Sequence, residues 1–278
     1  MYIVSPQGAA VKIYSPHDCI NNCFFCKDKS VYVNTDDFDL NKVIKSMEKI
    51  NKLTPKCDFI ITGGEPMTSM AGLERILMSI DFMNLRGANH KIFIETTLPV
   101  KKQDIYTLNR WKNVVTRIDV ARHVKDYVVE SNDILFSYLR IPVRIVCVLP
   151  SIEEAQYAYE IIDRFKDYQC IKEIQFRDNF TDVTFDNLYN MMGNKVLKTL
   201  TSLFSKKIND CEFEYTSCSW TCKIDKTVQF YRQMANPNFE SALNEINIKP
   251  DGSIEEVDLA QYKESLNTNN WTKIIESI

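Results

Sequence analysis

Three cysteines near the start of the chain have a spacing that suits a metal site. Cys19, Cys23 and Cys26 are separated by three residues and then by two, in the stretch Cys-Ile-Asn-Asn-Cys-Phe-Phe-Cys. Cysteine thiolates are the usual ligands of iron–sulfur clusters, so these three could hold three irons of a [4Fe-4S] cluster. Without a fourth protein ligand, the last iron would stay open to a small molecule.

Two other interpretations of the cysteine loop stay open at this point. Cysteine is among the most buried residue types, so the three thiols could simply pack in a core. A zinc knuckle is the second alternative, but structural zinc takes four ligands, and no second Cys-X-X-Cys pair follows. His17 is close enough in the sequence to serve as a fourth ligand.

A second motif, Gly63-Gly64-Glu65-Pro66, follows after a helix-sized interval. By itself it could be a tight turn, because glycine readily supplies a positive φ. The proline at its end restricts the backbone where the chain leaves the turn. Its position just past an apolar run places this motif, like the cysteine loop, at the end of a strand.

The elements expected to position these motifs alternate along the chain. Apolar residues at helical spacing predict a helix over residues 40–53 with Asp39 as its cap, and later helices follow the same pattern. Expected strands cover residues 11–15, 58–61, 91–94, 114–120, 143–149 and 171–176, and further helices lie near 73–83, 105–111, 134–139 and 152–165. Such alternation predicts a parallel α/β sheet, an open barrel or a doubly wound sheet, with its chemistry at the strands' carboxyl ends.

The rhythm of the sequence changes after about residue 180. A long apolar-periodic segment, residues 188–200, precedes β-like runs at 227–231 and 245–248, and Pro250-Asp251-Gly252 is a strong turn signal. We therefore expect a core over residues 1–180 and a small α+β C-terminal cap over residues 181–278.

The two motifs at the ends of successive strands resemble the radical S-adenosylmethionine (SAM) superfamily, over residues 11–178. The resemblance implies a partial (β/α)6 TIM-like barrel and a [4Fe-4S] cluster on Cys19, Cys23 and Cys26. It also implies that the open iron binds SAM and that SAM is cleaved reductively to a 5'-deoxyadenosyl radical, which abstracts hydrogen from a substrate. Flavodoxin or ferredoxin would be the electron donor.

The resemblance also implies roles for further residues. Phe25 would pack against the adenine of SAM, and Gly63, Gly64, Glu65 and Pro66 would hold its methionine end. Thr96, Thr97, Asp119 and Arg122 match positions that reach the ribose hydroxyls and the carboxylate, although polar residues of solvated loops are an equal alternative. Gln175, Arg177 and Asp178, at the end of the sixth expected strand, could face adenine or substrate.

The remaining cysteines and histidines divide into several groups. Cys211, Cys218 and Cys222 could bind a second Fe-S cluster, although packing thiols or a redox-active or substrate-facing cysteine are alternatives. Cys57, Cys147 and Cys170 lie in or beside expected strands, which predicts core positions. His90 and His123 have no partner at a metal-ligand spacing, so we expect them to be solvated or hydrogen-bonded.

Composition limits the cellular compartment and the binding partners that we expect. The chain has 278 residues and a net charge of −3. This charge argues against binding of duplex nucleic acid through many phosphate contacts. No apolar run is long enough to span a bilayer, and the first residues do not resemble a signal peptide. We expect a cytoplasmic protein, where reducing conditions favour metal or redox roles for its cysteines.

The first expected strand begins near Met1, so we expect no N-terminal peptide-recognition domain. A small-molecule or nucleotide-like substrate is therefore predicted. Modification of a peptide or protein side chain is the alternative, which an auxiliary cluster would favour. A non-catalytic Fe-S or zinc scaffold is the alternative from a different functional class.

Overall fold

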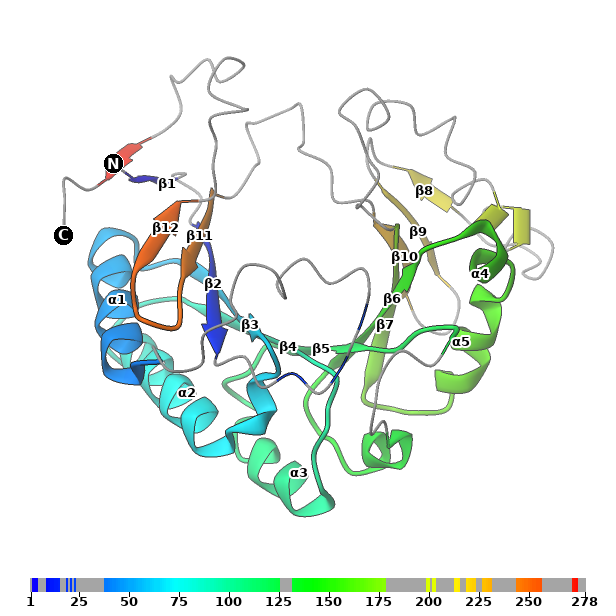
Figure 1. Ribbon diagram of the computed structural model, residues 1–278, viewed down its shortest axis with the longest axis horizontal. Helices are drawn as coiled ribbons and strands as arrows, with labels where there is room; N and C mark the ends of the chain where they lie inside the picture. The colour runs from blue at the N-terminus through cyan, green and yellow to red at the C-terminus, as the bar shows by residue number, and fades with distance from the viewer. Residues whose placement is uncertain are drawn as a thin grey trace.

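A curved, open sheet forms the centre of this computed structural model (Figure 1). Its middle strands run parallel to one another. The structure describes residues 2–4, 9–15, 19, 21, 23, 38–125, 132–178, 199–200, 202–203, 213–215, 219–223, 227–231, 244–256 and 272–274. The concave side and the carboxyl ends of the strands are where the predicted site residues gather.

Six strands run parallel and in chain order through the middle of the sheet. They are β2 (Ala9–Ser15), β3 (Cys57–Gly63), β4 (Lys91–Thr96), β5 (Arg117–Ala121), β6 (Val143–Leu149) and β7 (Ile171–Asp178). All six predicted strands are confirmed. The fourth begins later than predicted, because Val115 N still donates a helix-like hydrogen bond to Trp111 O (2.8 Å) and so cannot join the sheet.

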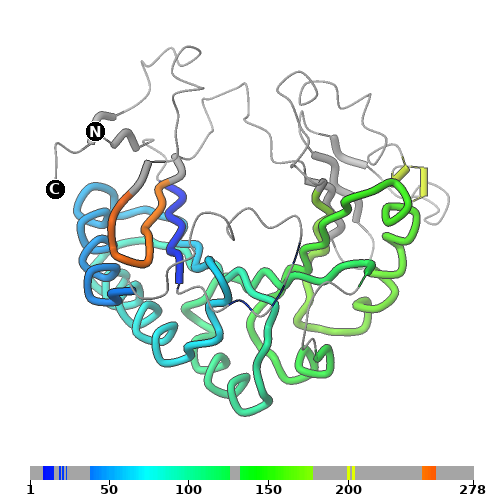
Figure 2. The backbone as a smooth tube through the Cα atoms, in the orientation of Figure 1, coloured from blue at the N-terminus to red at the C-terminus, as the bar shows by residue number. Residues whose placement is uncertain are grey.

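Helices cover the convex side of the sheet, as the tube in Figure 2 shows. They are α1 (Leu40–Leu53), η3 (Pro66–Thr68), α2 (Met70–Leu85), α3 (Lys102–Asn109), η4 (Asp133–Ser137), α4 (Ile152–Gln156) and α5 (Ala158–Phe165). Asp39 caps α1, accepting from Asn41 N at 3.0 Å, as predicted. Among the described helices, none combines the length and apolarity needed to cross a bilayer.

Two helix predictions differ from the structure. The segment near residue 135 is a short 3-10 helix, η4, rather than an α-helix. The helix predicted over residues 152–165 is broken at Tyr157, whose φ of −101° and ψ of 6° interrupt the helical path. The apolar face survives the break, because Ala155, Ala158 and Ile161 are all buried. Of the predicted helix at residues 188–200, only the last two residues are described.

Side chains alternate along each strand between two environments, because successive residues of a strand point to opposite faces. In β4, Ile92 and Ile94 are buried in the core beneath the helices, whereas Glu95 is on the concave face. In β5, Arg117 and Asp119 share that concave face. The convex face is therefore apolar, and the concave face carries charge.

Strands from the C-terminal part extend both edges of the same sheet. β10 (Thr227–Tyr231) pairs in parallel with β7, and β9 (Ser219–Lys223) and β8 (Phe213–Tyr215) follow it. At the other edge, β11 (Asn244–Ile248) pairs in parallel with β2, and β12 (Ile254–Glu256) pairs with β11. A separate two-stranded sheet joins β1 (Tyr2–Val4) to β13 (Thr272–Ile274). Strands from before and after residue 180 thus belong to one sheet. The predicted division into two domains stays a prediction.

The predicted turn at residues 250–252 joins β11 to β12 and packs on α1. Gly252 has a φ of +81°, and a Cβ there would lie 2.4 Å from Lys42 Cβ, so only glycine fits. Ser46 Oγ donates to Gly252 O at 2.6 Å, and Asp39 N donates to Pro250 O at 2.9 Å. The C-terminal hairpin is thereby fastened to the first helix.

Candidate cofactor-binding site

The cysteine loop begins at the carboxyl end of β2. Cys19 and Cys23 are partly exposed, and Asn21 between them is 2% exposed. Cys26 and Phe25 lie outside the described residues, as does His17. Two of the three predicted cluster ligands are therefore described, and both residues are partly exposed.

The cysteines of the core strands differ in kind from those of the loop. Cys57, Cys147 and Cys170 are buried, which confirms the prediction that they are core residues. Burial raises the pKa of Cys57 to about 12 and raises that of Cys147 as well. Because only the thiolate ligates a metal readily, these buried thiols are poor ligands, and the accessible pair on the loop fits an Fe-S cluster better.

Gly63, the last residue of β3, places the second motif beside the end of β2, where the cysteine loop begins. It pairs with Ser15 across β2 and β3, and its φ is +116°. A Cβ at this position would lie 2.8 Å from both Ser15 N and Ser15 O, so a side chain is excluded. Glu65 and Pro66 follow the Gly63-Gly64 pair and begin η3, with both side chains buried.

The carboxylate of Glu65 is 1% exposed and accepts four hydrogen bonds from the protein. Oε1 accepts from Met67 N at 3.1 Å and from Thr96 Oγ1 at 2.5 Å. Oε2 accepts from Thr97 N at 2.7 Å and from Thr97 Oγ1 at 2.8 Å. The side chain thus joins the end of β3 to the end of β4. Contact of Glu65 with the ammonium of SAM stays a prediction.

Asn21 joins the cysteine loop to the same cluster of hydrogen bonds. Its Nδ2 donates to Thr97 Oγ1 at 3.1 Å and lies 3.7 Å from Cys19 Sγ. Asn21 was not among the predicted site residues, because an asparagine between two cysteines carries no pattern that predicts burial. Its contact with Thr97, which directly follows β4 and is 76 residues away in the sequence, is visible only in the structure.

Asp119 lies within a ring of four charged side chains on the concave face, which we call the charge quartet. Arg117 Nε donates to Asp119 Oδ1 at 2.6 Å, and Arg144 Nη2 pairs with the other oxygen. Glu173 Oε2 lies 3.5 Å from Arg117 Nη1 and 3.8 Å from Arg144 Nη1, which closes the ring. Burial lowers the pKa of Arg144, and the charge of Asp119 opposes that shift. Asp119 is thus engaged by two guanidinium groups.

Arg122, just past the end of β5, is 2% exposed and holds three parts of the chain together. Its Nη1 donates to Thr97 O and to Ala121 O, both at 2.8 Å. Its Nε donates to Asp133 Oδ1 at 2.9 Å, and Asp133 Oδ2 in turn lies 2.6 Å from Arg164 Nη2. These contacts of Arg122 with Thr97, Ala121 and Asp133 are all within the protein, and its predicted contact with SAM stays a prediction.

The end of β7 adds polar groups to the concave face. Arg177 Nε donates to Gln175 Oε1 at 2.8 Å, and Arg177 Nη2 lies 4.0 Å from Glu95 Oε1 of β4. Since β5 and β6 separate these strands, the Arg177–Glu95 pair spans the concave face. The side chain of Asp178 is outside the described residues. Of the residues predicted at this strand end, Gln175 and Arg177 contact each other, and Glu95 is an unpredicted neighbour of Arg177.

The remaining predicted residues have separate outcomes. Cys211 and Cys218 lie outside the described residues, and only the backbone of Cys222, in β9, is described, so the auxiliary cluster stays a prediction. His90 and His123 are buried and hydrogen-bonded. Cys57 N donates to His90 Nδ1 at 3.0 Å, and Val148 N donates to His123 Nδ1 at 3.1 Å. Of the two predicted environments, solvated or hydrogen-bonded, the structure shows the hydrogen-bonded one for both histidines.

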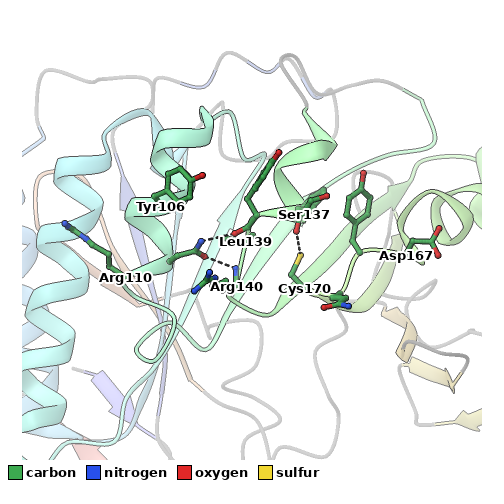
Figure 3. A pocket seen from close by; sticks show the side chains of 12 residues that line it. Tyr106, Arg110, Ser137, Leu139, Arg140, Asp167 and Cys170 are labelled. Atoms are coloured by element: carbon green, nitrogen blue, oxygen red, sulfur yellow. Dashed lines mark hydrogen bonds between the residues drawn. The ribbon is translucent and has the colours of Figure 1, made fainter.

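A groove of about 850 Å³ lies at the opposite end of the strands (Figure 3). Its lining includes Tyr106 and Arg140, and Cys170 directly precedes the start of β7. Hydrogen bonds within its wall join Asn109 to the backbone of Tyr138 and Arg140. Because α/β barrels place their chemistry at the carboxyl ends of strands, this groove is not the candidate site.

Comparison with solved structures identifies the fold. SuiB from Streptococcus suis bound to precursor peptide SuiA matches with a TM-score of 0.60 and 13% identity, over 96% of this chain and 62% of that one. The anSMEcpe structure with bound AdoMet and Kp18Cys peptide matches with a TM-score of 0.52 and 18% identity, over 71% and 60%. Both belong to the radical SAM enzymes, which are partial barrels. The chain has the partial-barrel fold of these structures.

This shared fold confirms the predicted partial (β/α)6 barrel. SuiB bound to S-adenosylmethionine also matches, with a TM-score of 0.58, 13% identity and coverage of 94% of this chain and 62% of that one. This chain spans less than two thirds of the length of each of these structures. No protein-family model matches the sequence, and no curated protein matches it.

Proposed function

We propose that this protein is a radical SAM enzyme. One observation carries the proposal: Asn21 and Glu65, from the two motifs, meet at Thr97, at the carboxyl ends of parallel strands. Two motifs that are specific as a pair in the sequence are thus neighbours in space. The radical SAM fold of the chain supports the same conclusion.

In this proposal Cys19, Cys23 and Cys26 hold the [4Fe-4S] cluster. When bound, the cluster supplies the electron that cleaves SAM to methionine and a 5'-deoxyadenosyl radical, which takes hydrogen from the substrate. Flavodoxin or ferredoxin would deliver that electron, and the protein would act in the cytoplasm. A second cluster on Cys211, Cys218 and Cys222 is part of the proposal only as an addition.

The protein's own residues would bind and orient SAM. The backbone of Gly63 and Gly64 would contact the methionine end, and Phe25 would pack against adenine. Glu65 and Pro66 are buried in the turn, so their support for SAM is to hold that backbone in place. Thr96, Asp119 and Arg122 lie on or beside the adjoining strands, where rigid support of the ribose and carboxylate contacts is the role their buried positions favour.

For the substrate we propose a polar small molecule or a nucleotide-like compound. The concave face below the motifs carries Arg117, Asp119, Arg144, Glu173 and Arg177, whose charges compensate each other in part. A face built from charged and hydrogen-bonding groups favours a substrate that can replace water at those groups.

Modification of a peptide is the second candidate, and the comparisons favour it. SuiB was solved with precursor peptide SuiA, and anSMEcpe was solved with a peptide and AdoMet. At 13% and 18% identity this likeness shows the fold alone, and the peptides bound in the two structures are the reason to test this substrate class. Iron and sulfide counts for wild type and Cys218→Ala would add a discriminating observation, because an auxiliary cluster favours peptide modification.

Anaerobic reconstitution tests the proposed activity. The wild-type protein, loaded with iron and sulfide and reduced with dithionite, should convert SAM to 5'-deoxyadenosine. Cys23→Ala should form none, whereas Cys57→Ala, which removes a buried core thiol, should keep its iron. A wild-type protein that binds zinc instead of a cluster, or that leaves SAM intact under these conditions, refutes the proposal.

The rate of deoxyadenosine formation also separates the two substrate classes. A substrate should accelerate SAM cleavage, so a small-molecule filtrate and a peptide fraction of the same host lysate are compared. Stimulation by the filtrate alone supports the small-molecule class, and stimulation by the peptide fraction alone supports peptide modification. Reaction of both fractions with Cys23→Ala provides the background.

A further inference from the structure

We infer that Asn21 raises the reduction potential of the cluster by donating a hydrogen bond to the sulfur of Cys19. The inference rests on the proposed function, because it concerns the cluster that Cys19 would hold. Hydrogen bonds to the sulfurs are one of the factors that set the potential of an Fe-S cluster. Asn21 would thus be a positioning and tuning residue, without contact to the reacting atoms.

The position of Asn21 supports a fixed donor. Its side chain is 2% exposed, and Nδ2 lies 3.7 Å from Cys19 Sγ and 3.1 Å from Thr97 Oγ1. The amide nitrogen carries two hydrogens, so it can serve both acceptors at once. Thr97 itself is held at its carbonyl by Arg122 Nη1 at 2.8 Å. The amide nitrogen that faces the sulfur is therefore also anchored to Thr97.

The hydrogen-bond pattern determines which end of the Asn21 amide faces the sulfur. Thr97 has one hydroxyl hydrogen, and Oγ1 donates it to Glu65 Oε2 at 2.8 Å. Glu65 Oε2 also accepts a hydrogen bond from Thr97 N, as expected of a carboxylate. Thr97 Oγ1 must then accept from Asn21, so the NH₂ group and not the carbonyl oxygen is on this side. The same NH₂ group faces Cys19 Sγ.

This orientation predicts the direction of the effect. One-electron reduction adds negative charge to the cluster and its thiolate ligands, and an N–H donor stabilises that added charge. Removal of the donor should therefore make reduction harder. Because Thr97 and Glu65 orient the donor, the turn that would hold SAM and the sulfur that would hold iron share one chain of hydrogen bonds.

The midpoint potential of the reconstituted cluster, measured by a redox titration followed by electron paramagnetic resonance, tests the inference. Asn21→Leu should shift the midpoint to a more negative potential than that of wild type. Thr97→Val, which removes the hydroxyl that orients Asn21, should shift it in the same direction by a smaller amount. Thr97→Ser retains the hydroxyl and should restore the wild-type midpoint.

Asn89→Leu is the matched control. Asn89 lies two residues before β4 begins, at the opposite end of that strand from Thr97. It should leave the midpoint unchanged. If Asn21→Leu fails to assemble a cluster, the comparison of Thr97→Val with Thr97→Ser decides the question. An unchanged midpoint in Asn21→Leu, or in Thr97→Val when Asn21→Leu does not assemble, overturns the inference. If the wild-type protein itself forms no cluster, the proposed function fails instead.

Discussion

Glu65 and Thr97 are joined by two hydrogen bonds to a single carboxylate oxygen. Thr97 N and Thr97 Oγ1 lie 2.7 Å and 2.8 Å from Glu65 Oε2, in a site that is almost completely buried. The two residues come from the ends of neighbouring strands. Their contact fixes the turn of the Gly63-Gly64-Glu65-Pro66 motif relative to β4, and its strength can be measured in the protein without a cofactor.

Glu65→Gln should lower the free energy of unfolding by about 2 to 4 kcal/mol, because the new NH₂ group faces buried donors that lose their acceptor. Urea unfolding of the metal-free protein measures the change. Glu74→Gln is the control: Glu74 pairs with the exposed Arg110, and its loss should cost less than about 1 kcal/mol. Equal effects of the two substitutions would show that the Glu65 network does not stabilise the fold.

Arg122→Met should destabilise the protein by about 3 kcal/mol, since a buried guanidinium that bonds to Thr97 O and Asp133 is lost. The same substitution at Arg110, which is 67% exposed, should have little effect on stability. Thermal and urea unfolding of both variants provide the comparison. A stable Arg122→Met protein would argue that this arginine is kept for ligand contact instead.

Asp119 and Arg144 should show strong energetic coupling in a double-mutant cycle. We expect a coupling energy of about 1 to 3 kcal/mol from the variants Asp119→Ala, Arg144→Ala and the double variant, because both side chains are largely buried in the charge quartet. The coupling between Arg110 and Glu74 should be smaller and should fall further at high salt. Additive effects at Asp119 and Arg144 would contradict the ring of ion pairs.

His90 should make stability depend on pH. Burial lowers the pKa of His90 from 6.5 to about 4, and Cys57 N donates to Nδ1, so the folded state favours the neutral ring. Between these values the unfolded chain binds a proton that the folded protein does not, so stability is complete above pH 6.5 and is lost as pH falls toward 4. The loss amounts to at most about 3 kcal/mol.

The pH effect is measured as the difference between wild type and His90→Gln in urea unfolding across this interval. The subtraction removes the contribution of carboxylates that titrate in the same range. The variant should be less stable than wild type at neutral pH, and the gap should narrow as the solution is acidified. A gap that stays constant with pH would show that His90 titrates alike in the folded and unfolded states.

The core strands and the first helix could be predicted from the sequence, because their signals are local. Alternation or apolar runs define β2, β3, β4, β6 and β7, and helical spacing after Asp39 defines α1. The errors fall where tertiary context overrides the local pattern. Residues 114–116 are β-branched and were expected in a strand, yet Val114 N and Val115 N donate back to Trp111 O and the strand begins only at Arg117. Tyr157 similarly interrupts the predicted helix, although the apolar face continues past it and no glycine or proline signals the break.

The sequence by itself determined the spacing of Cys19, Cys23 and Cys26 and the turn at Gly63, because ligand spacing and permitted φ are properties of a few consecutive residues. Only the tertiary structure decided that Asn21, which is 76 residues away, meets Thr97, or that two arginines enclose Asp119. Such contacts depend on which strands are neighbours and in what register they pair. A one-residue shift of β5 or β6 would turn Asp119 or Arg144 to the opposite face of the sheet.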